Sequence, residues 1–294
     1  MLNKKNGIGI FPLLNTVFLV FLMIVMLYPF LYAVFASVSN PAKLILHKGL
    51  LLSPIKPLSF DAYLAVFKDQ RILNGYKNTI IYLCLGTMIN MVFTSMAAYT
   101  LSIKSLMLRN PIMFAITFTM LFSGGMIPTY IQVYNLKMVN TLWAIVLPTA
   151  VNTMNLIIMR TYFQGIPESL RESAKIDGAN DILIFVRIIL PLSVPVLAVM
   201  ILYYGVFHWN SWLPAAIYLR TPGKYPLQIV LRDILIQNST DLMMGGGATG
   251  SEQYSISETL KYATIIVSTV PILLIYPFLQ KHFTKGIMIG AIKG

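Results

Sequence analysis

The chain has 294 residues, of which 57% are hydrophobic and only 11% are charged, and its mean hydropathy is +0.73. A water-soluble globular domain cannot bury so much apolar surface, so these values exclude one and indicate an integral membrane protein. In such a chain the formal net charge of +12 points to membrane lipid, not nucleic acid, as a partner. Cys84 is the only cysteine, which excludes an internal disulfide and a cysteine-based metal site.

Six apolar runs follow one another along the chain, each long enough to cross a hydrocarbon layer about 30 Å thick at about 1.5 Å of rise per residue. They cover residues 12–35, 78–101, 111–130, 141–159, 189–207 and 262–280. The strands of a membrane β-barrel would instead alternate apolar and polar residues. The sequence therefore predicts an all-α membrane protein with six transmembrane helices, of which the first is an uncleaved span and not a signal peptide.

An external segment separates the first two runs. Its prolines, Pro41, Pro54 and Pro57, indicate a loop, while the stretch "SFDAYLAVF" is typical of a short amphipathic helix at the outer surface. We therefore expect three parts: an N-terminal helix with its external segment over 1–77, a five-helix core over 78–280, and a C-terminal tail over 281–294.

A dense group of charges interrupts the apolar pattern between the fourth and fifth runs. Seven charged side chains lie among the 20 residues from 168 to 187, namely Glu168, Arg171, Glu172, Lys175, Asp177, Asp181 and Arg187. At about 3 kcal/mol each, placing them in lipid would cost on the order of 20 kcal/mol. This segment must therefore be solvated or bound by protein.

The residue types in this charged segment predict a short helix, a sharp turn and a second helix. Pro167 suits the first helical position, and Gly178 suits the left-handed conformation that ends many helices. Asn180 or Asp181 can cap the second helix, which leads into the fifth run. A helix this short is marginal in isolation, so we expect a partner to pack on it. The i,i+3 spacing predicts two ion pairs on its surface, Glu168 with Arg171 and Glu172 with Lys175.

One spacing in the segment is distinctive. Glu172-Ser173-Ala174 is followed by three residues, Gly178, nine residues and then Ile188-Ile189-Leu190-Pro191. This resembles the EAA loop of the permease subunits of binding-protein-dependent ABC importers. The family has Glu-Ala-Ala at the start of this loop, and this chain departs from it only in having Ser173 in place of the first alanine. Asp177-Gly178-Ala179 is similar to the carbohydrate-transporting branch.

The likeness extends over nearly the whole chain. The stretches "LYPFLYAVFASVS", "TLWAIVLPTAVNTMNLIIMRTYFQGIPESL", "WNSWLPAAIYL" and "KGIMIGAIKG" resemble permeases of the maltose-transporter type, especially those for complex oligosaccharides. The resemblance implies a type I ABC importer permease fold, in which the EAA loop over 166–191 contains a cytoplasmic coupling helix. The chain would then be a sugar-transporting subunit and not an enzyme.

The resemblance also implies how such a loop works. The helix around Glu168 to Lys175 would dock into a groove on an ATP-binding subunit, and closure of two such subunits would switch the spans from inward-facing to outward-facing. The residues implied in coupling are Glu168, Glu172, Ser173, Ala174, Asp177, Gly178, Ala179, Leu190 and Pro191. Ser173 and Ala174 would allow close approach of the partner. The charges alone also allow a solvated amphipathic loop without any partner.

The implied partners are a second, non-identical permease subunit, two ATP-binding subunits and an extracytoplasmic solute-binding protein. ATP and Mg²⁺ would be held by the ATP-binding subunits, and this chain would hold no cofactor or metal. The stretch "GGGATGS", residues 245–251, lacks the lysine of a phosphate-binding loop and is expected to be a flexible external connection.

No catalytic constellation is evident, because the three histidines lie in separate connections or ends and no acidic residue falls within the six runs. The missing carboxylates also argue against an ion-coupled secondary sugar carrier, which stays the alternative function because backbone carbonyls can hold sodium too. A membrane-embedded enzyme lacks a candidate site.

Polar residues of the fourth and fifth runs are candidates for the sugar path. Asn152, Thr153 and Asn155 are costly in lipid and should face protein or a water-filled cavity. Trp209 and Asn210 lie near the outer end of the fifth run, where aromatic stacking on sugars would be favourable. Hydrogen bonds between neighbouring helices, and an interfacial aromatic belt, are the alternatives for these two groups.

Charge density orients the chain. Lys and Arg divide equally between the two sides of six spans, 11 and 22 − 11 = 11, but the side that holds the termini has about 60 residues and the other about 105. We therefore expect both termini in the cytoplasm of a bacterial cell, with the chain a multi-pass protein of its inner or plasma membrane. The external side then carries 11 − 6 = +5, which would suit an acidic binding protein or acidic sugars such as uronides.

Overall fold

The computed structural model describes residues 10–243, 258–274 and 277. Over these residues the chain is helical and contains no strand, which confirms the predicted all-α class. The predicted external connection at 245–251 and the tail at 281–294 lie outside the described residues. The chain divides into two compact units, one formed by residues 1–70 with 233–270 and the other by residues 71–232 with 271–294.

The first unit contains α1 (Ile10–Ser37), α2 (Pro41–Leu46), α3 (Asp61–Lys68) and a helix over 258–274. The loop between α2 and α3 packs back on α1, because the backbone N–H of Leu51 donates to the Tyr28 hydroxyl at 3.0 Å. The rings of Tyr32 and Tyr262 meet edge to face with their centroids 5.6 Å apart. α3 confirms the short helix predicted in the external segment.

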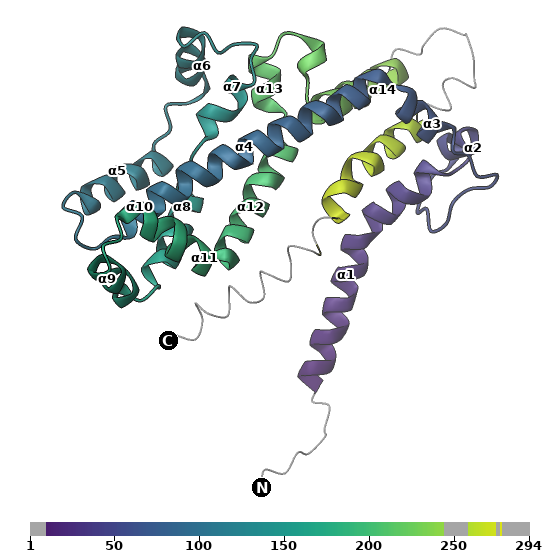
Figure 1. Cartoon of the computed structure of the whole chain (residues 1–294). Coiled ribbons are helices and arrows are strands. Elements are labelled where there is room, and N and C mark those ends of the chain that lie inside the picture. Colours follow the sequence, from purple (N-terminus) through teal and green to yellow (C-terminus); the bar gives the residue numbers. More distant parts are fainter. Residues whose placement is uncertain (1–9, 244–257, 275–276, 278–294) are drawn as a thin grey trace. The chain divides into compact units, whose positions relative to one another are not determined.

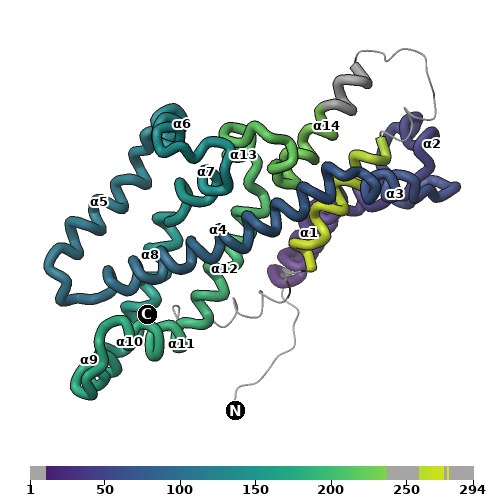
Figure 2. The backbone as a smooth tube through the Cα atoms, turned by 45° about the horizontal axis from the view of Figure 1, so that its top comes forward, coloured from purple at the N-terminus to yellow at the C-terminus, as the bar shows by residue number. Residues whose placement is uncertain are grey.

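The second unit is arranged around one long helix, α4 (Gln70–Ser102), which is followed by shorter helices (Figures 1 and 2). In chain order these are α5 (Arg109–Leu121), α6 (Met126–Asn135), α7 (Trp143–Val146), η1 (Leu147–Thr149), α8 (Thr153–Gln164), α9 (Glu168–Ile176), α10 (Asp181–Ile184), η2 (Phe185–Ile189), α11 (Leu190–Leu192), α12 (Val194–Trp209), α13 (Leu213–Tyr218), η3 (Pro222–Lys224) and the start of α14 (Leu227–Met243), whose residues from 233 on belong to the first unit. Figures 1 and 2 show α9 and α10 beside the end of α4 and the start of α5, whereas α6, α7 and α13 lie together at the opposite end of this unit.

Three of the predicted spans contain a bend. Run 111–130 becomes α5 and α6 at 114°, and run 141–159 becomes α7, η1 and α8 at 50°. Run 189–207 begins at the end of a helical stretch over 181–192 and continues, after a bend of 84°, as α12. Gly125, at a φ of +86°, stands at the first break, and prolines that cannot donate a backbone hydrogen bond stand at the other two.

Two described helices, α1 and α4, are long and apolar enough to cross a membrane, and the number rises to five if each bent pair is one span. The sixth run, 262–280, is only partly described, as the helix over 258–274. The count of six spans therefore stays a prediction, as does the division of the chain at residues 77 and 280.

The main core of the second unit lies where α4, α8, α9, α10 and α12 meet. Its buried members are Ala98, Tyr99, Met159, Phe163, Ala174, Ile184, Ile189, Val196, Met200 and Tyr204. Each large apolar side chain buried here stabilises the fold by about 1.5 to 3 kcal/mol. Because three of these residues belong to the segment 166–191, one face of the charged segment is part of the core of the unit.

Candidate functional site

The charged segment forms the predicted helix, turn and second helix. α9 ends before Gly178, whose φ of +83° is strained for any residue with a Cβ. The Asn180 side chain accepts a hydrogen bond from the backbone N–H of Leu183 at 2.8 Å and caps α10. Pro167 is the N-cap of α9, one residue earlier than predicted. We call the segment from Glu168 to Ile184 the elbow.

The two ion pairs predicted within α9 are not formed. Lys104 Nζ lies 3.0 Å from Glu168 Oε2, and Lys175 Nζ lies 3.2 Å from Asp181 Oδ1, so each pair joins α9 to another element. The hydrogen bond from Lys104, and then its charge, lower the pKa of Glu168. All four side chains are between 45% and 69% exposed, so water screens the pairs and they mainly orient α9.

One face of α9 is anchored on the same chain. The Arg171 guanidinium lies over the Tyr99 ring, 5.6 Å from its centroid, and Tyr99 in turn stacks on Phe185 at 5.1 Å. Ala174, one turn further, is buried in the core. The resemblance placed Ala174 at the surface that a partner approaches, whereas the structure turns it toward the unit's own core.

The opposite face of α9 is free of such contacts. Glu172 and Ser173 are exposed, and the Ile176 side chain, four residues after Glu172, is 86% exposed. So large an apolar side chain is unusual in solvent at the end of a charged helix. Ile176 was not among the predicted coupling residues, although its i,i+4 spacing from Glu172 places both side chains on one face of the helix.

The turn of the elbow is closed by its own backbone. The N–H of Gly178 donates to Lys175 O at 3.0 Å, and the N–H of Ala179 donates to Ala174 O at 2.9 Å. These bonds satisfy the last carbonyls of α9, as a left-handed helix end requires. Asp177, directly before Gly178, is the C-cap of α9 and is exposed.

A joint connects the elbow to the long helix α12. η2 is a π-helix, and α11 then carries Leu190 and Pro191 into an 84° bend at Ser193. Pro191 and Pro195 lack the N–H groups that a continuous helix would use across this point. Leu190 and Pro191 thus lie between the elbow and α12, and their part in transmitting movement stays a prediction.

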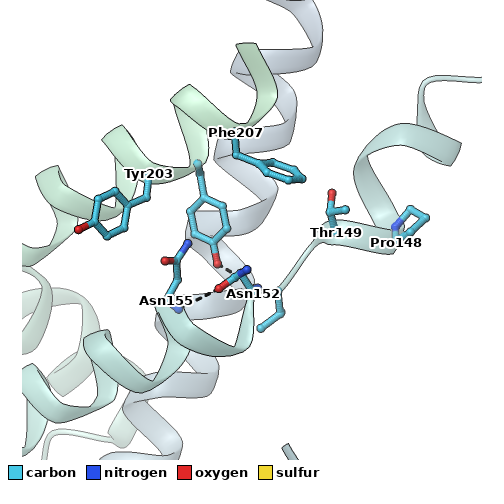
Figure 3. A pocket seen from close by; sticks show the side chains of 8 residues that line it. Pro148, Thr149, Asn152, Asn155, Tyr203 and Phe207 are labelled. Atoms are coloured by element: carbon cyan, nitrogen blue, oxygen red, sulfur yellow. Dashed lines mark hydrogen bonds between the residues drawn. The ribbon is translucent and has the colours of Figure 1, made fainter. Parts of the chain in front are cut away.

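A pocket of about 370 Å³ opens between α8 and α12 (Figure 3). Its lining residues are Pro148, Thr149, Val151, Asn152, Asn155, Tyr203, Tyr204 and Phe207. Two of the residues predicted for the sugar path, Asn152 and Asn155, are among them and lie close together in Figure 3. The pocket therefore combines amide, hydroxyl and aromatic groups, which are the groups that bind sugars.

The other residues predicted for the path do not line this pocket. Trp209 is buried and meets the Tyr76 ring edge to face at 6.2 Å. Asn210 Nδ2 donates to Val206 O at 2.9 Å at the end of α12, and Thr153 is the first residue of α8. Their assignment to the path stays a prediction.

The break between η1 and α8 forms one wall of the pocket through Thr149, Val151 and Asn152, and side chains of α4 and α12 bond the backbone of this break. Asn90 Nδ2 donates to Thr149 O at 2.6 Å and to Ala150 O at 3.0 Å. The Tyr204 hydroxyl accepts from the N–H of Asn152 at 3.2 Å and also lies 2.7 Å from Thr94 Oγ1. Irregular backbone at membrane depth persists where such partners are present.

His208 forms a hydrogen bond with Asn90, the residue that holds the backbone of this wall. Its Nε2 lies 2.6 Å from Asn90 Oδ1, and because a carbonyl oxygen only accepts, Nε2 carries the proton. The ring fits only beside a glycine, since a Cβ at Gly86 would lie 2.5 Å from it. Sequence analysis set His208 aside and did not single out Asn90, because their pairing joins residues 118 positions apart.

Comparison with known proteins gives consistent relatives. The chain is 42% identical over 289 residues to the polygalacturonan/rhamnogalacturonan transport system permease protein YtcP of Bacillus subtilis, covering 97% of this chain and 99% of that protein. It is 41% identical over 294 residues to Protein LplC of the same organism, covering 100% of this chain and 98% of the relative. No family model matches the sequence.

Among solved structures, a chain of a bacterial ABC transporter involved in the import of the acidic polysaccharide alginate superposes with a TM-score of 0.84. It is 30% identical, and the match covers 96% of this chain and all of that chain.

These relatives show to which class of membrane protein the bent helices and the elbow belong. The chain belongs to the permease subunits of carbohydrate ABC importers. It is accordingly an integral membrane transport subunit and not an enzyme, and it works with ATP-binding subunits and a substrate-binding protein. The ion-coupled carrier is set aside by this assignment.

Proposed function

We propose that this chain forms one half of the path through which an ATP-driven importer moves an acidic oligosaccharide. The observation that carries the coupling part of this proposal is the elbow, where α9 is anchored on one face by Arg171 and Ala174 and presents Glu172 and Ile176 on the other. An ATP-binding subunit would cover the exposed face. Burial of a fully exposed isoleucine side chain would contribute about 1.5 to 3 kcal/mol to such docking.

The anchoring explains how a small movement would reach the membrane. Because Ala174, Ile184 and Ile189 are packed in one core with α4, α8 and α12, displacement of α9 would drag these helices instead of bending a loose loop. The bend at Ser193 would be the hinge. Asn152 and Asn155, on the wall that these helices hold, would bond sugar hydroxyls.

The acidic character of the substrate is supported by charge. Between residues 71 and 232 the chain has only four acidic residues, all in the charged segment: Glu168, Glu172, Asp177 and Asp181. At the opposite end of the unit, Lys224 Nζ donates to Asn140 O at 2.7 Å, and the N–H of Arg220 donates to Asn140 Oδ1 at 3.1 Å. Lys137 precedes Asn140 by three residues, so this end is cationic without a counter-charge of its own.

The relatives point in the same direction. The transporter with the matching fold imports the acidic polysaccharide alginate, and the name of one relative specifies polygalacturonan, which is a polymer of a uronic acid. We infer that the substrate here is also an oligosaccharide that carries carboxylates. Aromatic and amide groups would hold its rings while the positive end attracts its charge.

We infer further that both termini lie in the cytoplasm, so that the elbow faces the ATP-binding subunits there. A second, non-identical permease subunit would complete the path. Two ATP-binding subunits would bind ATP and Mg²⁺, and this chain would bind neither.

The test is to purify the chain from its own membrane in mild detergent, identify its companions and measure ATPase activity. We expect ATP-binding subunits and a different permease to co-purify, and an oligogalacturonate with the binding protein to stimulate the ATPase more than a neutral oligosaccharide does. Gly178→Pro should abolish the stimulation, because proline cannot adopt a φ of +83°. Equal stimulation by neutral sugars would refute the acidic substrate, and normal coupling in Gly178→Pro would refute the role of the elbow.

A further inference from the structure

Two arginines are held side by side near the elbow. Arg160 Nε donates to Leu101 O at 2.9 Å, which fixes its guanidinium at the end of α4. With its carboxamide oxygen facing the arginines, Gln164 accepts from Arg160 Nη2 at 3.1 Å and also from Arg109 Nη2. One amide oxygen thus bridges two guanidinium groups, on α8 and at the start of α5. We call Arg109, Arg160 and Gln164 the arginine pair site.

No carboxylate neutralises this pair within the part of the chain that the structure describes. Glu168 is paired with Lys104, and Asp181 with Lys175. The Nε of Arg109 is buried and has no hydrogen-bond partner among the described residues. Two adjacent cations repel each other, and a buried donor without an acceptor is costly. The arrangement therefore lacks an anion.

The backbone at this place adds to the positive potential. Arg109 is the first residue of α5, where the helix dipole disfavours a cation and favours an anion. The N-cap residue, Leu108, makes no side-chain cap, and Pro111 has no N–H of its own. The N–H of Arg109 itself donates to Leu106 O at 3.2 Å, so the helix start offers its dipole and not a row of free donors. An anion placed between the two arginines would relieve their repulsion and would lie at the positive end of that dipole.

We propose that the arginine pair site binds a phosphate group. Two guanidinium groups at the positive end of a helix match the charge and the several acceptor oxygens of a phosphate. The group can come from a lipid headgroup or from free phosphate, and the structure favours lipid. α5 has no buried residue, and its apolar side chains, including Phe114 at 73% exposed, run away from Arg109 where acyl chains would lie.

The first experiment counts bound lipid on the assembled transporter. The complex is extracted from membranes that contain phosphatidylglycerol, washed with increasing detergent, and weighed intact by native mass spectrometry. The double variant Arg109→Gln/Arg160→Gln is compared with Arg187→Gln, an exposed arginine on η2 near the same end of the unit. We expect the retained phosphatidylglycerol to fall at least five-fold in the double variant and to be unchanged in the control.

The second experiment needs no variant, so it stands even if the double variant fails to assemble. A photoactivatable phosphatidylglycerol is cross-linked to the native complex, and the adducts are mapped by peptide mass spectrometry. We expect adducts in the peptides that contain residues 109–112 or 160–164. A parallel arm measures whether inorganic phosphate, without lipid, protects Arg109 and Arg160 from phenylglyoxal.

The outcomes separate the sources. Lipid retention and adducts at these peptides support a headgroup site, and protection by inorganic phosphate without lipid retention supports a site for free phosphate. Equal lipid retention in all forms with no protection by phosphate would overturn the proposal. So would protection that appears only when ATP-binding subunits are added to lipid-free chain, because a protein carboxylate would then be the counter-charge. None of these results depends on which sugar is transported.

Discussion

His208 Nε2 and Asn90 Oδ1 lie 2.6 Å apart and join α12 to α4 beside the break between η1 and α8. Asn90 uses its other atom, Nδ2, to hold the carbonyls of Thr149 and Ala150. A single amide therefore satisfies three polar groups where the chain leaves helical geometry. This connection holds the non-helical backbone beside the pocket.

Replacing Asn90 with alanine should destabilise the protein by about 2 kcal/mol, because buried acceptors and a donor lose their partner at once. Thermal unfolding of the purified transporter in detergent measures this. Asn135→Ala, at the exposed end of α6, is the matched control and should change stability by less than about 0.5 kcal/mol. Equal effects of the two substitutions would show that the Asn90 hydrogen bonds are unimportant.

Gly86→Ala should also damage the wall, since its methyl group would lie 2.5 Å from the His208 ring and push it off Asn90. We expect a loss of about 1 to 3 kcal/mol and slower transport. Gly205→Ala, where a Cβ meets open space, should have no such effect. Adding His208→Ala removes the collision, so the double variant should lose less than the sum of the two single effects. Additive losses would contradict the contact.

The docking face of α9 can be tested without harming the fold. Ile176→Ser should leave expression and thermal stability unchanged, because the side chain is 86% exposed, yet reduce sugar-stimulated ATPase activity several-fold. Ile182→Ser, a 75% exposed isoleucine just beyond the turn, is the control. Glu172→Lys should likewise leave the chain in the membrane and uncouple transport from ATP hydrolysis. Normal coupling in both Ile176→Ser and Glu172→Lys would remove this face from the mechanism.

The ion pair between Lys104 and Glu168 should respond to pH in one direction. Because the folded-state pKa of Glu168 is lowered, the contribution of the pair is fully present above the ordinary glutamate pKa and is lost as pH falls through the lowered value. A spin label at the exposed Ser169 should therefore become more mobile only in acid. In Glu168→Gln the label should be mobile at neutral pH already, while Asp177→Asn should behave like the unmodified chain. A label whose mobility is the same in all three forms would show that the pair does not orient α9.

The proposed contact of Asn152 and Asn155 with sugar can be tested by a variant that keeps the helix cap of α8 but removes the two amide groups. Asn152 caps α8 by accepting from the N–H of Asn155 at 3.1 Å, so Asn152→Ser should keep the helix start. Asn152→Ser/Asn155→Ala should then fold normally but raise the apparent KM for the oligosaccharide about ten-fold, with a smaller effect on maximal rate. A transport rate and substrate profile that are unchanged would exclude these asparagines from the path.

Local chemistry was enough to predict much of this molecule. Composition and run length indicated an all-α membrane protein. Gly178 predicted the turn of the elbow and Asn180 or Asp181 its cap, because a left-handed φ and an N-cap depend on residues within one turn; the structure shows that the cap is Asn180. The spacing from Glu172 to Pro191 pointed to the family for the same reason.

Contacts between residues far apart in the sequence could not be predicted from local spacing. Neighbours in sequence suggested that Glu168 pairs with Arg171, whereas the folded chain brings Lys104 to Glu168 and leaves Arg171 to lie on Tyr99. The support of the pocket by Asn90 and His208, and the arginine pair site, likewise need three helices packed together. Ion pairs and buried hydrogen bonds form with whichever partner packing brings within about 3 Å, and helical spacing alone does not contain that information.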